Sequence, residues 1–449
     1  MDESFDVVIL GMGPGGEVAA GRLLAGGKKV ALVERELLGG ECAYWACIPS
    51  KTLLRPPEVK SEAYKAFGLS TPTLDLEKVF DYRDYMIRNL DDSGEVESYE
   101  DQGATVIKGE GRITNPGKVE ANGHVLEAEH VIIATGSGPS ILPIEGLEDV
   151  PYWTNREATT MREVPERAIV IGGGPNGIEA SQWLSRLGTE VTIVQSPKRL
   201  INREDPKASE LIQAALEQEG INVRVGQRVE KARKDGDGNI VATLDDGTEV
   251  ETAVMVLAAG RTLRVQGIGL EAVGVEPNEV GLPIDESCRL AEGVWAVGDV
   301  TGVSLFTHVA KYQGRIAADN ILGKTRWADY RGIPRVVFSD PEVAATGQTE
   351  EQAQEQGVDV ATTTLDLTEV LARPYTYEEN PRGTLGLVAD RERRILVGAW
   401  AVAPLAGEWI HQASLAIRAE IPIEKLLDIV VQFPTYSEAY LEALEQLDL

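Results

Sequence analysis

The sequence predicts an α/β protein with two Rossmann-like dinucleotide-binding domains, each with a β-meander insert, and an α+β C-terminal dimerisation domain. Two strand–glycine turn–helix–strand patterns about 160 residues apart predict the nucleotide domains. Beyond residue 334, strand-like runs are followed by apolar helices without a glycine loop, and such helices suit a subunit interface.

Composition excludes several classes of partner. The chain has 449 residues, with 43 Lys+Arg against 72 Asp+Glu, a net charge of −29 that disfavours nucleic acid and anionic membranes. No apolar stretch approaches the roughly 20 residues of a membrane span. The start, MDESFDVVIL, lacks the basic region of a signal peptide, and three cysteines make no secreted framework. We expect a cytoplasmic protein.

The first nucleotide pattern begins with the apolar run 6–10. Gly11 allows a tight turn, Gly13 lets the backbone approach a pyrophosphate, and Gly16 lets the following helix pack against the strand. The helix N-terminus supplies N–H groups for the phosphates. The next strand ends at Glu34, where a carboxylate is placed to accept from ribose hydroxyls.

The second pattern repeats the first with Gly172, Gly174 and Gly177 between two strand runs. Turn signals at Asn122-Gly123 and Asp246-Gly247 predict hairpins, so each nucleotide unit carries a meander. A third landmark is the segment 293–300, a strand ending in Gly298-Asp299. An acid at the carboxyl end of such a strand suits a ribityl or phosphate ligand.

The segment 39–51 (GGECAYWACIPSK) carries the chemistry. In an ideal helix, residues five apart are roughly 8–9 Å apart at Cα, and a disulfide needs less than about 7 Å. Cys42 and Cys47 can therefore pair only if the helix is irregular there or starts between them. A helix N-terminus lowers a thiol pKa, and Lys51 follows Cys47 by one turn. We expect redox chemistry and no resident metal, because no further Cys or His lies nearby in sequence.

These motifs, in this order, resemble the class I flavoprotein disulfide reductases, the pyridine nucleotide–disulfide oxidoreductase family of dihydrolipoyl dehydrogenase, glutathione reductase and mercuric reductase. The resemblance covers essentially the whole chain. It rests on the cysteine segment, the two glycine loops, and the segments ATGS (134–137), AAGR (258–261), GVWAVGD (293–299), THVAKYQGRIAADNI (from 307), IPRVVFSDPEVAATG (from 333) and AGEWIHQASLAI (from 406).

The resemblance implies FAD in the first unit, NAD(P)H in the second, a homodimer and a small-molecule acceptor. Cys47 resembles the cysteine nearest the flavin, and Cys42 the interchange thiol. Lys51 and Glu179 resemble the ion pair near the flavin, and Asp299 the ribityl ligand. The other expected cofactor-binding residues are Gly111, Thr135, Gly136, Ser137, Gly260 and His308.

The expected domains follow the ligands that they bind. Residues 1–150 and 271–333 are expected to form the FAD-binding and central parts. Residues 151–270 are expected to bind NAD(P)H, and residues 334–449 to form the dimerisation (interface) domain.

The chain departs from the family's pattern at the C-terminal segment His-Pro-x4-Glu, whose histidine is the acid–base for the interchange thiol. Here Phe433 stands at the histidine position, while Pro434 and Glu438 keep register. A phenyl ring carries no proton, so efficient turnover of a dithiol–disulfide substrate is in doubt. Glu438, or Tyr436 despite an ordinary pKa near 10, could act through water.

Three more departures bear on the acceptor. Glu41 replaces the usual threonine beside the first cysteine. Tyr44-Trp45 add aromatics that either cover or stack on an acceptor such as a quinone or pack against the subunit interface. Mercuric reductases also lack the histidine but need an added C-terminal cysteine pair. This chain ends EALEQLDL, so we expect no mercuric reduction.

The choice of pyridine nucleotide is weakly encoded. The second unit's strand ends in Gln195, where NADH users often have an acid, and Lys198 and Arg199 follow. Losing the acid removes repulsion of a 2′-phosphate, and either cation could bind that group. The sequence therefore leans to NADPH.

Three functions remain open. The enzyme either passes electrons from NAD(P)H through FAD and Cys42–Cys47 to a disulfide or other thiol-reactive acceptor, or reduces a quinone or electrophile directly from the flavin. In a third reading the chain is a redox-sensing or complex-bound flavoprotein subunit with little turnover.

Overall fold

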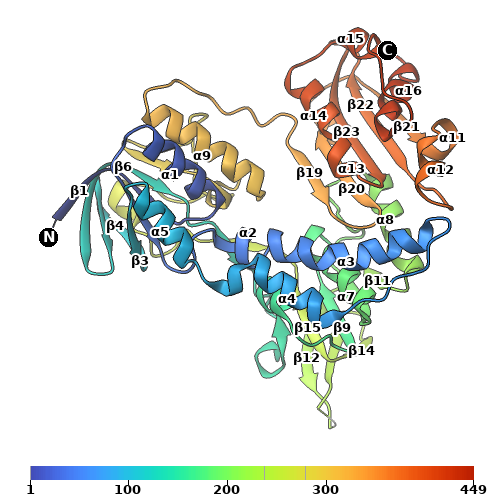
Figure 1. Ribbon diagram of the computed structural model, residues 1–449, viewed down its shortest axis with the longest axis horizontal. Coiled ribbons are helices and arrows are strands. Elements are labelled where there is room, and N and C mark those ends of the chain that lie inside the picture. Colours follow the sequence, from blue (N-terminus) through green and yellow to red (C-terminus); the bar gives the residue numbers. More distant parts are fainter. Residues whose placement is uncertain (1, 237, 279) are drawn as a thin grey trace. The chain divides into compact units, whose positions relative to one another are not determined.

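The computed structural model describes residues 2–236, 238–278 and 280–449, and its chain divides into two compact units (Figure 1). Unit 1 comprises Met1–Pro49, Asp81–Ser140 and Gly260–Asp329. Unit 2 comprises Ser50–Phe80, Ile141–Ala259 and Tyr330–Leu449. These units are drawn by compactness, and the expected four-part division, which follows ligands, stays a prediction.

Unit 1 is built on a mostly parallel sheet with the strand order β17-β18-β6-β1-β2-β3. The central strand β1 pairs in parallel with β2 and β6, with Val7 opposite Val30 and Val8 opposite Val131. Every residue of β2 is buried, as is usual for a strand inside a parallel sheet, and its four apolar residues are followed by the buried carboxylate of Glu34. The strands are β1 (Asp2–Leu10), β2 (Val30–Glu34), β3 (Thr105–Lys108), β6 (His124–Ile133), β17 (Arg289–Ala291) and β18 (Val294–Ala296).

Two helices of unit 1 lie side by side, α1 (Pro14–Ala25) and α9 (Thr307–Ile321) (Figure 1). They approach closely because glycines face each other: a Cβ on Gly314 would lie 2.4 Å from the carbonyl oxygen of Gly15. Arg22 and Asp319 join the helices at 2.9 Å. The first strand–helix–strand prediction is thereby confirmed, and α9 is placed beside the glycine loop.

The predicted meander of unit 1 is also present. Strands β4 (Gly111–Asn115) and β5 (Lys118–Ala121) pair antiparallel, and β5 pairs with β6. The turn between β5 and β6 is Asn122-Gly123, with φ of 47° and 79°. Positive φ at both positions is what a two-residue hairpin needs, so this hairpin prediction is confirmed.

Unit 2 repeats the parallel architecture with the order β11-β10-β9-β15-β8 and a separate meander β12-β13-β14. Its glycine loop joins β9 to helix α7 (Pro175–Leu187), and the predicted Asp246-Gly247 turn joins β13 to β14. The strands are β8 (Tyr152–Trp153), β9 (Arg167–Ile171), β10 (Glu190–Gln195), β11 (Asn222–Val225), β12 (Val229–Lys234), β13 (Ile240–Leu244), β14 (Glu249–Thr252) and β15 (Val254–Leu257).

The C-terminal part of unit 2 is an antiparallel sheet of order β19-β20-β23-β22-β21, which confirms the α+β prediction. Helix α14 (His411–Arg418) packs on β23, and α16 (Ala439–Glu445) packs on β22. The strands are β19 (Pro334–Val337), β20 (Glu342–Gly347), β21 (Val360–Asp366), β22 (Thr384–Asp390) and β23 (Ile395–Ala403).

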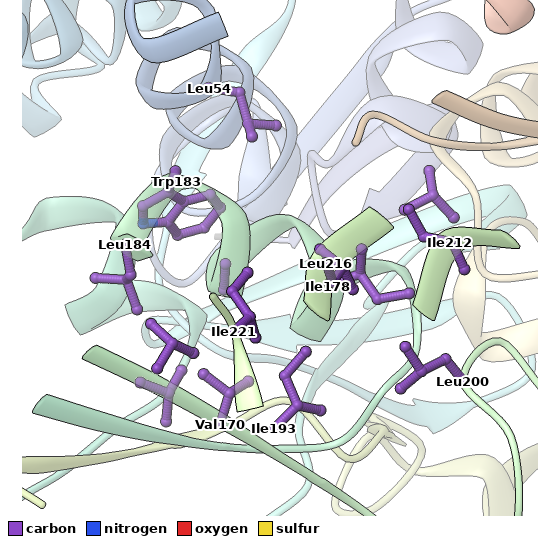
Figure 2. Packing of buried hydrophobic residues seen from close by; sticks show 14 of the residues in the cluster. Leu54, Val170, Ile178, Trp183, Leu184, Ile193, Leu200, Ile212, Leu216 and Ile221 are labelled. Atoms are coloured by element: carbon purple, nitrogen blue, oxygen red, sulfur yellow. The ribbon is translucent and has the colours of Figure 1, made fainter. Parts of the chain in front are cut away.

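A large core in unit 2 joins α3 (Cys47–Lys65) and α4 (Leu76–Met86) to the second nucleotide sheet. In Figure 2, Leu54 of α3 lies over Trp183 of α7, while Val170 and Ile193 approach from the strands. Full burial of each such side chain contributes about 1.5–3 kcal/mol. This packing explains why residues 50–80 belong to unit 2, although the sequence assigned them to the first segment.

A buried charge cluster supports unit 2 around Asp340. Its carboxylate lies 2.8 Å from the ammonium of Lys65, 2.7 Å from the guanidinium of Arg186 and 3.2 Å from that of Arg382. Burial alone would raise the pKa of Asp340, but the three cations together hold it well below its usual range. The carboxylate thus connects α3, α7 and the loop between β19 and β20.

We predict that Asp340→Asn destabilises the protein at pH 7 by about 1.5–3 kcal/mol, because it removes a largely buried carboxylate that hydrogen-bonds to three cations. Each cation keeps a second acid, Glu219 for Arg186 and Glu378 for Lys65 and Arg382, so the loss is smaller than for an uncompensated buried charge. Since the folded-state pKa is depressed, this stabilisation is present above the unfolded pKa of about 3.9 and is lost as pH falls through the folded value. Urea unfolding at pH 7 and below pH 4 measures both effects. Asp75→Asn, which removes an exposed partner of Lys78, is the control. Equal midpoints for the two variants at pH 7 would contradict the prediction.

Candidate active site

The first glycine loop leaves an open position between two packed ones. Gly11 has a φ of 96°, and a Cβ there would lie 2.4 Å from the carbonyl oxygen of Ala134. A Cβ on Gly16 would lie 2.2 Å from the oxygen of Gly11. At Gly13 a Cβ would meet nothing within 4 Å, and no side chain caps the N-terminus of α1 there. This open backbone at a helix N-terminus fits a pyrophosphate.

The second glycine loop has the same construction. Gly172 has a φ of 118°, and its Cβ would lie 2.4 Å from the oxygen of Ala258. A Cβ on Gly177 would lie 1.8 Å from the oxygen of Gly172, while Gly174 again has nothing within 4 Å. The N-terminus of α7 also lacks a side-chain cap. The residues present therefore fit two dinucleotides, one in each unit.

Glu34, the last residue of β2, and Gln195, the last residue of β10, make equivalent hydrogen bonds to the two glycine loops. Glu34 accepts a hydrogen bond from the N–H of Met12 at 2.8 Å, and Gln195 accepts one from the N–H of Gly173 at 2.8 Å. Gln195 also donates to the carbonyl oxygen of Arg199 at 3.2 Å. The two positions therefore differ in charge while sharing one structural task. Lys198, two residues after Ser196, is exposed.

The cysteine segment is broken between its two cysteines. Helix α2 (Gly40–Tyr44) ends before Trp45, and α3 begins at Cys47. The helix is therefore interrupted between the two cysteines, and a new helix starts at the second one. This is one of the two alternatives that the spacing allowed. Gly39 has a φ of 114° and donates its N–H to the carbonyl oxygen of Met12 at 2.7 Å. The cysteine segment is therefore anchored on the first glycine loop.

One hydroxyl joins the two sulfurs. Thr307, the first residue of α9, places Oγ1 3.1 Å from Sγ of Cys42 and 3.2 Å from Sγ of Cys47. Cys42 also hydrogen-bonds to Cys47, and this bond together with burial raises the pKa of the Cys42 thiol, while Thr307 and Lys311 act to lower it. The two sulfurs thus share one hydrogen-bonding environment.

Lys51 and Glu179 come together as an ion pair in unit 2. The ammonium of Lys51 lies 2.7 Å from Oε2 of Glu179, whose other oxygen accepts the N–H of Phe338 at 3.0 Å. Lys51 also lies 4.8 Å from the centre of the Phe338 ring. Glu179 is buried, and these contacts fix the position of its carboxylate. The role of the pair at a flavin stays a prediction.

Of the remaining cofactor residues expected in unit 1, Ser137 contacts Asp299. Ser137 donates its hydroxyl to Asp299 at 2.5 Å and accepts from Nε of Arg261 at 2.6 Å. Thr135 donates to the carbonyl oxygen of Arg264 at 2.7 Å. Three glycines are also held in place: Gly136 and Gly260 have positive φ, and Gly111 has no room for a Cβ. His308 is exposed, with its ring stacked 5.1 Å from that of Phe306.

Sequence reasoning missed the partners of Glu41. This carboxylate lies 3.3 Å from Arg264 and 3.8 Å from Arg261, and all three side chains are largely buried. The unusual acid beside Cys42 is therefore neutralised within unit 1. The segment GRTLR (260–264) after the predicted strand 254–257 was the available signal, but its pairing with Glu41 is a contact across more than 200 residues.

The structure bears on two aromatic alternatives that the sequence left open. Tyr44 has no exposed surface and contacts Arg88, so it does not cover an acceptor. Tyr436 is buried against the ring of Trp409, at 6.1 Å, and burial raises the pKa of its hydroxyl further, so it does not suit proton transfer. Phe433, in contrast, is 71% exposed. Glu438 accepts the N–H of Thr435 at 3.1 Å as part of a helix cap.

Within the described ranges 2–236, 238–278 and 280–449, no helix is long and apolar enough to cross a membrane.

Comparisons with known proteins agree with this geometry. The chain is 34% identical over 447 residues to a mercuric reductase of Lysinibacillus sphaericus, covering 97% of this chain and 81% of that protein. It is 35% identical to a dihydrolipoyl dehydrogenase of Thermus scotoductus, covering 99% and 98%. Among solved structures, LpdA of Mycobacterium tuberculosis superposes with a TM-score of 0.88 at 27% identity, covering 99% of each chain.

A second solved structure is the Cu(II) complex of the flavoprotein disulfide reductase RclA of Escherichia coli, with a TM-score of 0.87 at 25% identity over 98% and 99% of the chains. Residues 5–314 match the family described as pyridine nucleotide-disulphide oxidoreductase, and residues 333–444 match its dimerisation domain. The chain therefore belongs to the pyridine nucleotide-disulphide oxidoreductases, NAD(P)H-dependent flavoprotein enzymes for which FAD is the typical cofactor.

Proposed function

We propose that this enzyme passes electrons from NAD(P)H through FAD to the Cys42–Cys47 pair, and from Cys42 to a thiol-reactive small-molecule acceptor. The observation that carries the proposal is the Thr307 hydroxyl within 3.1–3.2 Å of both sulfurs across a broken helix. That geometry lets the two sulfurs act as one redox pair. When bound, FAD would accept a hydride from nicotinamide and deliver an electron pair to a disulfide.

The chain's own residues have separate tasks in this proposal. Glu34 and Asp299 hold the FAD ribose and ribityl groups, and the open backbone at Gly13 receives the pyrophosphate. Lys51, fixed by buried Glu179, supplies a positive charge near the flavin ring. Cys47 accepts electrons from the flavin side. Once the disulfide is reduced, both thiols lose their protons to solvent, and re-formation of the Cys42–Cys47 disulfide releases two electrons. These electrons go as a pair to a two-electron acceptor, or singly to two Cu(II) ions, each of which becomes Cu(I).

The acceptor that we favour is a soft, thiophilic electrophile, including a metal ion such as Cu(II). Two lines support this choice: relatives named mercuric reductase, and the Cu(II) complex of RclA. A disulfide acceptor releases a thiolate that needs a proton, and Phe433 carries none. A thiophilic metal ion makes no such demand. With Tyr44 buried, the quinone alternative loses one of its two motivating aromatics.

We further propose NADPH as the preferred donor, because Gln195 performs the loop-holding task of Glu34 without a negative charge, and exposed Lys198 lies nearby in sequence. We also propose a homodimer in the cytoplasm. The dimerisation domain and the exposed Phe433 support the first part. A reactive cysteine pair in a chain with only three cysteines fits a reducing compartment.

We predict that Cys42→Ser lowers NADPH-driven reduction of Cu(II) or of a small aromatic disulfide at least about 100-fold, because the attacking sulfur is gone. Anaerobic bleaching of the flavin by NADPH should persist, since that step does not need Cys42. Stopped-flow absorbance and steady-state NADPH oxidation measure the two steps. Undiminished turnover in the variant would refute the cysteine route.

We predict that Gln195→Glu lowers the NADPH-to-NADH ratio of kcat/KM by about tenfold or more, since a carboxylate repels a 2′-phosphate and accepts from ribose hydroxyls. The loop itself should survive, because Glu34 makes the equivalent bond in unit 1. Ser196→Ala is the matched control at the neighbouring exposed position. An unchanged ratio in Gln195→Glu would show that this position does not select the nucleotide.

A further inference from the structure

We propose that Glu41 is a positioning residue that couples the cysteine segment to the flavin site, because it shares the arginine that also faces Asp299. The inference rests on the proposed function, in which Asp299 holds the ribityl group of FAD and Cys42 meets the acceptor. It concerns the residue at which the cysteine segment has an acid in place of the family's usual threonine.

Glu41 is held by two arginines. It belongs to the first turn of α2 and directly precedes Cys42, so the position of its carboxylate and that of the Cys42 backbone are set together. Oε1 lies 3.3 Å from the guanidinium of Arg264, and Oε2 lies 3.8 Å from that of Arg261. Only 13% of the Glu41 side chain is exposed, so water screens these charges weakly. The two arginines therefore hold the turn that carries Cys42.

Both arginines are anchored on the backbone of the expected cofactor residues. Arg261 is the first residue of β16 (Arg261–Leu263), which pairs antiparallel with β7 (Ser137–Pro139). Arg264 follows β16, and its N–H donates to the carbonyl oxygen of Gly136 at 2.9 Å. These backbone hydrogen bonds fix where the two arginine side chains begin.

Arg261 is shared between Glu41 and Asp299. Its Nε lies 3.7 Å from Oδ2 of Asp299, nearly the same as the 3.8 Å between its guanidinium and Glu41. The same Nε donates to Oγ of Ser137 at 2.6 Å, and the Ser137 hydroxyl donates to Asp299 at 2.5 Å. One guanidinium thus balances two acids from distant segments, one beside Cys42 and one at the expected ribityl position.

This sharing has a consequence at both ends. An arginine between two carboxylates divides its electrostatic attraction between them. Without the charge of Glu41, the guanidinium of Arg261 acts on Asp299 alone and competes with a ribityl hydroxyl for its oxygens. The turn that carries Cys42 loses a contact at the same time. A coupling free energy is reciprocal, so FAD bound at Asp299 in turn stabilises the Cys42 turn.

The test compares wild type with Glu41→Gln, which removes the charge and keeps the shape of the side chain. In the oxidised enzyme, the dissociation constant of FAD, measured from flavin fluorescence on dilution, should rise about tenfold. FAD-saturated enzyme is also mixed with NADPH in a stopped-flow spectrometer, and bleaching of the flavin should keep its rate. The later transfer of electrons from the flavin to the cysteines should slow about tenfold, because the turn is less well placed.

Three matched variants separate the coupling from a loss of folding. Glu127→Gln removes an exposed acid that pairs with Lys118 in the same unit, and it should change neither quantity. Glu41→Asp keeps the charge and should keep the dissociation constant of FAD within about threefold of wild type. Arg261→Lys keeps a charge but loses the planar fork that reaches two partners, so it should behave like Glu41→Gln.

The double variant that combines Glu41→Gln with Arg261→Lys shows whether the two residues act through one link. It should weaken FAD binding no more than either single variant, because both break the same link. Multiplied single effects, or wild-type values in Glu41→Gln for either measurement, would overturn the coupling. Failure of the proposed function looks different, because transfer to the cysteines would then be missing already in wild type.

Discussion

The peptide groups of Met12 connect cofactor binding to cysteine chemistry. The Met12 N–H is held by Glu34 at 2.8 Å, and its carbonyl oxygen accepts the N–H of Gly39 at 2.7 Å. One residue of the first glycine loop is therefore bonded both to Glu34 at the end of β2 and to the segment that carries Cys42. Any side chain on Gly40 would press on Gly13, with a Cβ 2.9 Å from the Gly13 Cα. The close fit of these two loops requires glycine at position 40, where φ is also 61°, and it sets the start of α2.

From that anchor the electrostatics of unit 1 follow a consistent pattern. Arg264 forms an ion pair with Glu41, and Arg261 forms one with Asp299. The charges of both acids are therefore balanced within unit 1. Both sulfurs contact the Thr307 hydroxyl at the start of α9. The hydrogen bond to Cys47 and burial raise the pKa of the Cys42 thiol.

Periodic and turn signals were enough to predict the two nucleotide sheets, the meanders and the α+β C-terminal part, because each depends on residues close together in sequence. The break between Cys42 and Cys47 was predictable as one of two alternatives, because disulfide geometry excludes a regular helix. Thr307 and Arg264 were not identified as partners of the cysteine segment, since their contacts with it join residues more than 200 positions apart. The role of Tyr44 stayed open for a related reason: the burial of an aromatic beside a cysteine is decided only by the packing of α2.

The assignment of residues 50–80 shows a second limit. Sequence motifs assign residues to domains by the ligand expected to bind there. The compact units instead group residues whose apolar side chains pack together. Leu54 follows the cysteine segment directly, yet it packs with Trp183 in the second core (Figure 2). Helix α3 therefore begins in one compact unit and continues in the other. No local pattern distinguishes a helix that stays with its own domain from one that joins the next.

The central claim, that Cys42 and Cys47 lie in the electron path, is tested most directly by an anaerobic titration of the purified yellow protein with NADPH, recorded as full absorbance spectra. The account predicts a long-wavelength charge-transfer band after one equivalent, because the Cys47 thiolate would then lie against oxidised flavin. Bleaching of the flavin without that band would show that electrons stop at the flavin, and would contradict the assignment of the cysteine pair.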